Sequence, residues 1–277
     1  MKYSDVRWLK VGSLLVRLGF AMAAVLVAAC ATGGHVGTPG DGKTDVVTAS
    51  DEPDVRRRAS IRLELAVSYF AEGKTTFALD ELKQALVIDP SYAQAYNLRG
   101  LVYMRLSDLH LAEESFRRAI ALDPREGGTL QNYGWLLCQS GRFGQATDAF
   151  NQALAIPLYG DRAKTYLTMG LCQSKAGQID AAERSLTRSY ELDAGNPITG
   201  FNLAALLFKR GEFVRAQFYI RRLNNSELAN AESLWLGIKV ERRLGSTVAM
   251  QQLAEQLKKR FAQAPELSLY ERGAFDE

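Results

Sequence analysis

A pattern of residues that recurs about every 34 positions constrains the fold of this chain more than any other feature. Each copy has a stretch with helical periodicity, a short turn that often holds glycine, a second helical stretch and then a proline or its equivalent. The clearest copies repeat small and aromatic residues in register: Gly100, Ala112, Phe116 and Ala119 in one, and Gly134, Ala146, Phe150 and Ala153 in the next. A fixed period of this length predicts repeated pairs of helices.

Six copies fit the pattern, and they resemble the tetratricopeptide repeat. With first residues at 59, 93, 127, 163, 197 and 230, the spacings are 34, 34, 36, 34 and 33. Small residues such as Gly100 and Ala112 let paired helices approach closely, and a proline such as Pro124 ends a second helix. One unit cannot bury its apolar face, so we predict an all-α, right-handed superhelical solenoid of six helix pairs over residues 56–265.

The first 29 residues predict an export signal. Basic residues from Lys2 to Arg17 precede an apolar stretch, 18–29, that is too short to span a bilayer. The segment ends in Val27-Ala28-Ala29-Cys30, which resembles a bacterial lipobox, so Cys30 is the predicted lipidation site and mature N-terminus. An ordinary secretory signal with a chance cysteine, or an uncleaved anchor, is the alternative. By analogy with bacterial sorting rules, Ala31 in place of aspartate favours the outer membrane.

Residues 30–55 are rich in Gly, Thr, Asp and Ser and show no periodicity, which predicts a flexible tether that carries the lipid at Cys30. The formal charge of +3 does not indicate nucleic-acid binding. Four of the 34 basic residues and one of the 31 acidic residues lie in the first 29 positions, which leaves 30 of each elsewhere. A neutral mature chain offers no general attraction for a phosphate backbone.

The tetratricopeptide resemblance implies that positions 5, 9 and 12 of each first helix line a concave partner-binding groove. These positions are Leu63, Val67, Phe70, Asn97, Leu101, Met104, Gln131, Trp135, Cys138, Leu167, Leu171, Ser174, Phe201, Ala205, Phe208, Leu234, Ile238 and Glu241. We take the first eight as the candidate site. The row is mostly apolar, which favours an amphipathic helix or a hydrophobic strand as ligand. Packing between neighbouring first helices is an equally good interpretation of any one of them.

Cys138 and Cys172 lie 34 residues apart, near the ends of first helices that the architecture places side by side. Export would expose them to an oxidising compartment, where a disulfide across this loop would contribute about 3 to 4 kcal/mol in the chain-entropy model. They occupy slightly different helical positions, and buried free cysteines are common, so the sequence leaves the bond open.

The sequence contains no pattern typical of catalysis. It has no phosphate-binding glycine motif beside a strand and no cluster of metal-ligating residues. His110 falls at a turn between helices, where we expect a surface residue. We therefore predict no catalytic residues, no cofactor, no metal and no small-molecule substrate.

Three stretches narrow the resemblance to a family: Tyr133-Gly-Trp-Leu-Leu-Cys138, Gly170-Leu-Cys-Gln173 and the segment from Ser233 to Gly245. With the lipobox and six repeats they resemble the PilF/PilW type IV pilus biogenesis and stability lipoproteins. The resemblance implies an outer-membrane pilotin that binds the pilus secretin subunit and promotes its localisation and multimerisation, as pilus assembly and twitching motility require. The alternative is a tetratricopeptide lipoprotein scaffold that recruits peptidoglycan-remodelling enzymes. Residues 266–277 form a tail without an assigned role.

Overall fold

The computed structural model describes residues 53–275, and within this range the chain is helical, without strands. The predicted signal segment 1–29, Cys30 and the tether up to residue 52 lie outside the described residues. The described residues form thirteen helices in this order: α1 Asp54–Ala71, α2 Thr75–Ile88, α3 Ala93–Arg105, α4 Leu109–Leu122, α5 Gly127–Gln139, α6 Phe143–Ala155, α7 Arg162–Lys175, α8 Ile179–Leu192, α9 Pro197–Lys209, α10 Phe213–Asn224, α11 Ala231–Arg243, α12 Thr247–Arg260 and α13 Pro265–Glu271.

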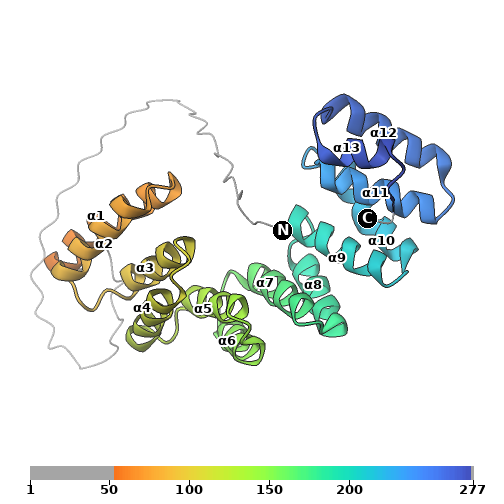
Figure 1. The fold of residues 1–277 in the computed structure, drawn as a ribbon. Helices are drawn as coiled ribbons and strands as arrows, with labels where there is room; N and C mark the ends of the chain where they lie inside the picture. The colour runs from red at the N-terminus through yellow and green to blue at the C-terminus, as the bar shows by residue number, and fades with distance from the viewer. Residues whose placement is uncertain (1–52, 276–277) are drawn as a thin grey trace, which may run out of the picture. The chain divides into compact units, whose positions relative to one another are not determined.

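The first twelve helices form six pairs, each an odd-numbered helix with the even-numbered helix that follows it. Figure 1 shows these pairs in chain order, and helices in contact belong to the same pair or to neighbouring pairs. This arrangement confirms the predicted repeat solenoid. None of the helices in the described part is long and apolar enough to span a membrane.

The turn inside each pair is built on one residue with a left-handed backbone. After α5, Gly141 has φ 75°, its N–H donates to the Cys138 carbonyl, and the N–H of Arg142 donates to the Leu137 carbonyl. Glycine adopts this conformation without a Cβ clash, and the two bonds satisfy carbonyls at the helix end. The turn thus reverses the chain within a few residues, so the second helix packs back on the first.

The sixth unit begins one residue later than predicted. Its left-handed turn residue, Gly245, lies 34 positions after Gly211, the turn residue of the fifth unit. Helix α11 likewise begins at Ala231, 34 positions after Pro197 at the start of α9. The predicted start at 230 is therefore wrong, and positions 5, 9 and 12 of this unit are Trp235, Lys239 and Arg242.

Paired helices meet where the backbone of the first helix lies against a large side chain of the second. A Cβ added to Gly100 would lie 2.6 Å from Phe116 Cε1, and one added to Gly134 would lie 2.7 Å from Phe150 Cε1. The glycine thus opposes the aromatic ring sixteen residues later. Ala112, which we had paired with Gly100, is buried in the same cluster as Phe116.

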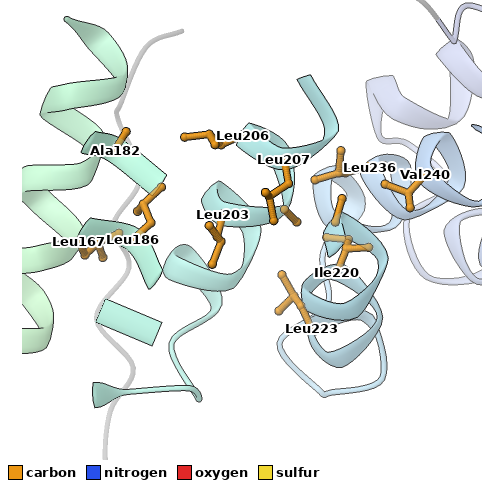
Figure 2. Packing of buried hydrophobic residues seen from close by; sticks show 12 residues of the cluster. Leu167, Ala182, Leu186, Leu203, Leu206, Leu207, Ile220, Leu223, Leu236 and Val240 are labelled. Atoms are coloured by element: carbon orange, nitrogen blue, oxygen red, sulfur yellow. The ribbon is translucent and has the colours of Figure 1, made fainter. Parts of the chain in front are cut away.

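Buried side chains also join one unit to the next. Figure 2 shows leucines and isoleucine from α7 to α11 in one cluster that runs across units four, five and six. Its buried members are Leu167, Ala182, Leu186, Leu203, Ala204, Leu206, Leu207, Ala216, Ile220, Leu223, Leu236 and Val240. Each pair therefore buries its apolar surface against its neighbours, as a repeat solenoid requires.

The tail that we predicted from residue 266 onward is folded in large part. Helix α13 packs against α11 and α12, and Phe275 beyond it lies on the ring of Trp235. Sequence reasoning missed this helix, although its first residue, Pro265, lies 34 positions after Ala231 at the start of α11.

The contact at Gly100 predicts the effect of one methyl group. Gly100→Ala should lower the free energy of unfolding by about 1 to 3 kcal/mol, because the new Cβ overlaps the Phe116 ring. Gly200→Ala is the matched control, since Gly200 is also a buried helical glycine but has nothing within 4 Å of an added Cβ. That change should leave stability unaltered or raise it by about 0.4 to 1 kcal/mol. Guanidinium unfolding followed by circular dichroism measures both, and equal shifts would contradict this account of the glycine.

Candidate functional site

Positions 5, 9 and 12 of the six first helices, with the corrected sixth unit, make up what we call the first-helix row. The eight candidate residues of units one to three keep their predicted positions. They are not equally accessible, however: Val67 is 51% exposed, Gln131 is 4% exposed, and the other six are half-buried. Most of the side chains predicted to line the groove are thus partly packed in the interior and partly exposed to solvent.

The half-buried apolar members pack against the cores beneath them. Leu63, Phe70 and Leu101 contact the cluster of units one and two, and Leu101 and Met104 also contact the cluster around Phe116. Trp135 contacts the cluster that contains both helix-borne cysteines. Each of these side chains therefore packs on one side and can offer the other side to a ligand. The sequence allowed either packing or ligand contact at each position, and the structure is compatible with both for the same side chain.

Polar members of the row bridge neighbouring first helices. The Asn97 side-chain oxygen accepts from Asn132 Nδ2 at 3.1 Å, and Gln131 Nε2 donates to Thr168 Oγ1 at 3.3 Å. The burial of Gln131 corrects its assignment as a ligand-contacting residue, because α7 covers it.

Arg105 belongs to the same face, although sequence reasoning did not select it. Its guanidinium lies 3.8 Å from the centre of the Phe70 ring and donates to the Phe70 carbonyl. Phe70 is thereby partly covered by a cation, which makes the first two units less apolar than predicted. The spacing in the sequence could have indicated this contact. Arg105 follows Phe70 by one residue more than the 34-residue repeat, and Asn132 follows Asn97 by the same spacing.

The sixth unit differs most from the prediction. Leu234, Ile238 and Glu241, which we had placed in the groove, are fully buried. Leu234 and Ile238 belong to the core beside α12, whereas Glu241 accepts hydrogen bonds from Arg221 and Gln217 on α10. A shift of one residue turns a helix by roughly 100°, and this rotation moves all three from the row into the interior.

Charged groups outside the row hold units together. Glu113 on α4 accepts from Arg142 at 2.8 Å and from the Tyr133 hydroxyl at 3.2 Å. Burial by itself would raise the pKa of Glu113, but these hydrogen bonds and the charges of Arg142 and Arg117 hold it below its ordinary value. This group is therefore an ionised link between units two and three and not a proton donor.

Within residues 53–275, no group of three or more His, Cys, Asp and Glu side chains could hold a metal ion. His110 is exposed at the start of α4, as its position at a turn predicts.

Cys138 and Cys172 form a disulfide with a Cα–Cα distance of 5.8 Å. Both side chains are buried, and the bond joins α5 to α7, the first helices of units three and four. The bond that the sequence left open is therefore present in the structure, at position 12 of the row in unit three. It ties the two units at the seam where Gln131 bonds to Thr168.

Comparison with known proteins identifies the type of repeat and a related protein. Family models described as TPR repeat and tetratricopeptide repeat match residues 68–107, 91–158 and 163–196. The type IV pilus assembly protein PilF of Pseudomonas aeruginosa is 30% identical over 205 residues, which span 72% of this chain and 81% of that protein.

Two solved structures of high similarity extend this comparison. The crystal structure of PilW, described as a widely conserved type IV pilus biogenesis factor, has a TM-score of 0.70 at 30% identity and covers 77% of this chain and 98% of its own. The structure of Pseudomonas aeruginosa PilF has a TM-score of 0.69 at 28% identity and covers 79% of this chain and 99% of its own. The helix pairs of the described region thus correspond to nearly the whole of both.

The disulfide predicts a stability that depends on redox conditions. Reduction should lower the free energy of unfolding by about 3 to 4 kcal/mol, because it releases a loop of 34 residues in the unfolded chain. Thermal midpoints with and without reductant measure this, and the double variant Cys138→Ala, Cys172→Ala, which has no bond to break, should show no difference. Mass spectrometry of unreduced, alkylated protein checks the bond itself. Two alkylated thiols at these positions before reduction would contradict it.

Proposed function

Because this chain belongs to the PilF/PilW family of type IV pilus biogenesis proteins, we propose that it is an outer-membrane pilotin for the pilus secretin. In this role it binds the secretin subunit through the first-helix row and promotes the localisation and multimerisation of the ring. The observation that carries the proposal is the likeness to PilW and PilF over 98% and 99% of their chains, which makes the whole scaffold common to the three.

The accessible part of the row supports binding to an apolar segment of a protein. Units one and two supply the apolar row members Val67, Phe70, Leu101 and Met104, and Val67 is the most exposed apolar member of the row. Met and Phe adapt well to apolar ligands, and Arg105 beside Phe70 adds a group that can meet an aromatic ring or a carboxylate. A secretin segment before its assembly into a ring would present such apolar surface.

A lipid anchor at Cys30 supplies the second part of the proposal. This residue lies outside the described residues, so the lipobox sequence supports the step by itself. Modification with several acyl chains would hold the repeat domain at the inner face of the outer membrane. The proposed function thus separates into an anchor that determines location and a row that determines the partner.

Val67 offers the sharper test of the row, since charges at the half-buried Phe70 or Leu101 would also disturb packing. Val67→Asp should weaken binding to the periplasmic part of the secretin at least tenfold, which corresponds to about 1.4 kcal/mol. Val214→Asp is the control, because Val214 is a valine 70% exposed on the second helix α10. Calorimetric titration measures the affinity, and unchanged unfolding midpoints show that both variants are folded. Normal binding by Val67→Asp would exclude unit one from the interface.

Cys30→Ser tests the anchor separately. The purified variant should bind secretin as tightly as the parent chain, while in cells the secretin multimers should fail to reach the outer-membrane fraction. Membrane fractionation with immunodetection measures this. Retention of the variant in the outer membrane would contradict lipid anchoring. Recovery of peptidoglycan hydrolases in place of secretin from solubilised outer membranes would favour the scaffold alternative.

A further inference from the structure

The first-helix row ends on an aromatic ring that the chain itself supplies. The Phe275 ring stacks on Trp235 with centres 5.3 Å apart and planes 30° apart, and the Arg242 guanidinium lies 3.9 Å from the Phe275 centre. Lys239 lies 5.4 Å from the Trp235 ring. An indole with one cation beside it and a second cation over the ring stacked on it is an environment that selects aromatic side chains, by stacking and by cation–π attraction.

These three α11 residues occupy positions 5, 9 and 12 of the sixth unit. They are therefore the counterparts of Leu63, Val67 and Phe70 in the first unit. Phe275 lies on the row where, by the proposed function, a partner segment would lie.

The path of the chain shows that Phe275 is not simply the start of a seventh repeat. In unit five Phe213 follows the turn residue Gly211 by two positions, and its ring lies 5.4 Å from Phe208 in the same unit. Phe275 likewise follows a left-handed residue, Gly273, by two positions. Its ring nevertheless contacts residues of the preceding unit, so the segment after α13 folds back onto α11.

The segment that carries Phe275 is weakly held. Helix α13 has seven residues, none of them buried, and a helix of this length is unstable by itself. Phe275 is itself half-buried. Leu234, Ile238 and Leu257 underneath are fully buried, and Phe275 packs against their cluster only from its rim, as a half-buried side chain. Local opening that releases the tail should therefore cost much less than unfolding the unit.

We propose that Trp235, Lys239 and Arg242 form an aromatic-binding subsite at the C-terminal end of the row, and that Phe275 occupies it as an exchangeable internal ligand. The ligand class is a protein segment with an aromatic side chain flanked by carboxylates, which the cations of α11 attract. The tail has this chemistry in its own sequence, Phe275-Asp276-Glu277. The identification of the competing partner rests on the proposed function; the subsite does not.

A tryptophan reporter tests the subsite directly. In the chain from residue 31 onward, Trp135→Phe leaves Trp235 as the sole tryptophan, because the remaining one of the three is Trp8. Adding Phe275→Ala should shift the Trp235 emission to longer wavelength. A peptide with the sequence of residues 271–277 should then reverse the shift in a saturable manner. The parent with Phe275 in place should need at least tenfold more peptide, since its subsite is occupied nine-tenths of the time or more.

A peptide with alanine in place of its phenylalanine is the control and should have no effect. Circular dichroism establishes that the variants are folded, and Phe275→Leu, which keeps apolar bulk without a ring, provides a second background if Phe275→Ala is disrupted. Absence of any peptide response, or equal responses with and without Phe275, would overturn the proposal and leave the tail as a fixed cap.

A second measurement separates this inference from the proposed function. Phe275→Ala should bind the periplasmic part of the secretin about tenfold more tightly than the parent, because the internal competitor is gone. Unchanged or weaker binding would overturn the competition. If neither the parent nor any variant binds secretin, the proposed function fails, whereas the peptide titration still decides the subsite.

Discussion

Gly100 on α3 lies so close to the Phe116 ring on α4 that a single added Cβ would come within 2.6 Å of it, and this kind of contact recurs through the chain. It sets the distance between paired helices, and hence the slot into which the next pair fits. Unit three repeats it with Gly134 and Phe150. In unit six the sizes are exchanged, since Ile238 stands at the glycine position and Ala254 at the aromatic one. Dense packing requires complementary volumes at this contact, whichever helix supplies the larger side chain.

The closeness of the pairs determines the character of the first-helix row. First helices of neighbouring units lie near enough for Asn97 to bond with Asn132 and for Cys138 to bond with Cys172. A side chain on such a seam has one flank in the core and one flank in solvent. The row is therefore a firm surface of mostly half-buried side chains, whose positions are held by bonds between the units.

The first and sixth units differ in how far their apolar surface is covered. A terminal unit lacks a neighbour and leaves apolar surface uncovered unless another segment caps it. At the first unit Ile61 and Leu65 remain 55% and 40% exposed on α1. At the sixth unit α13 and Phe275 cover Trp235, which is only 6% exposed. The solenoid thus has apolar side chains exposed at its first unit and covered at its sixth unit, and the sixth unit carries the aromatic subsite.

Sequence alone was enough for the helix pairs and their order, because both depend on residues within one repeat and the repeat occurs six times. It located the glycines at the contact, but the group that faces Gly100 is the Phe116 ring and not Ala112. It also sufficed for the eight row positions of units one to three. Tertiary structure decided how much of Phe70 or Gln131 a partner can reach, because that depends on the angle at which the next first helix crosses. It decided the register of the sixth unit, which the turn at Gly245 places one residue later than predicted. The contact of Phe275 was likewise beyond the sequence pattern, since it joins a residue 40 positions earlier without any repeat to indicate it. Local, repeated interactions can be read from a single chain, whereas contacts made once between distant segments depend on the assembled surface.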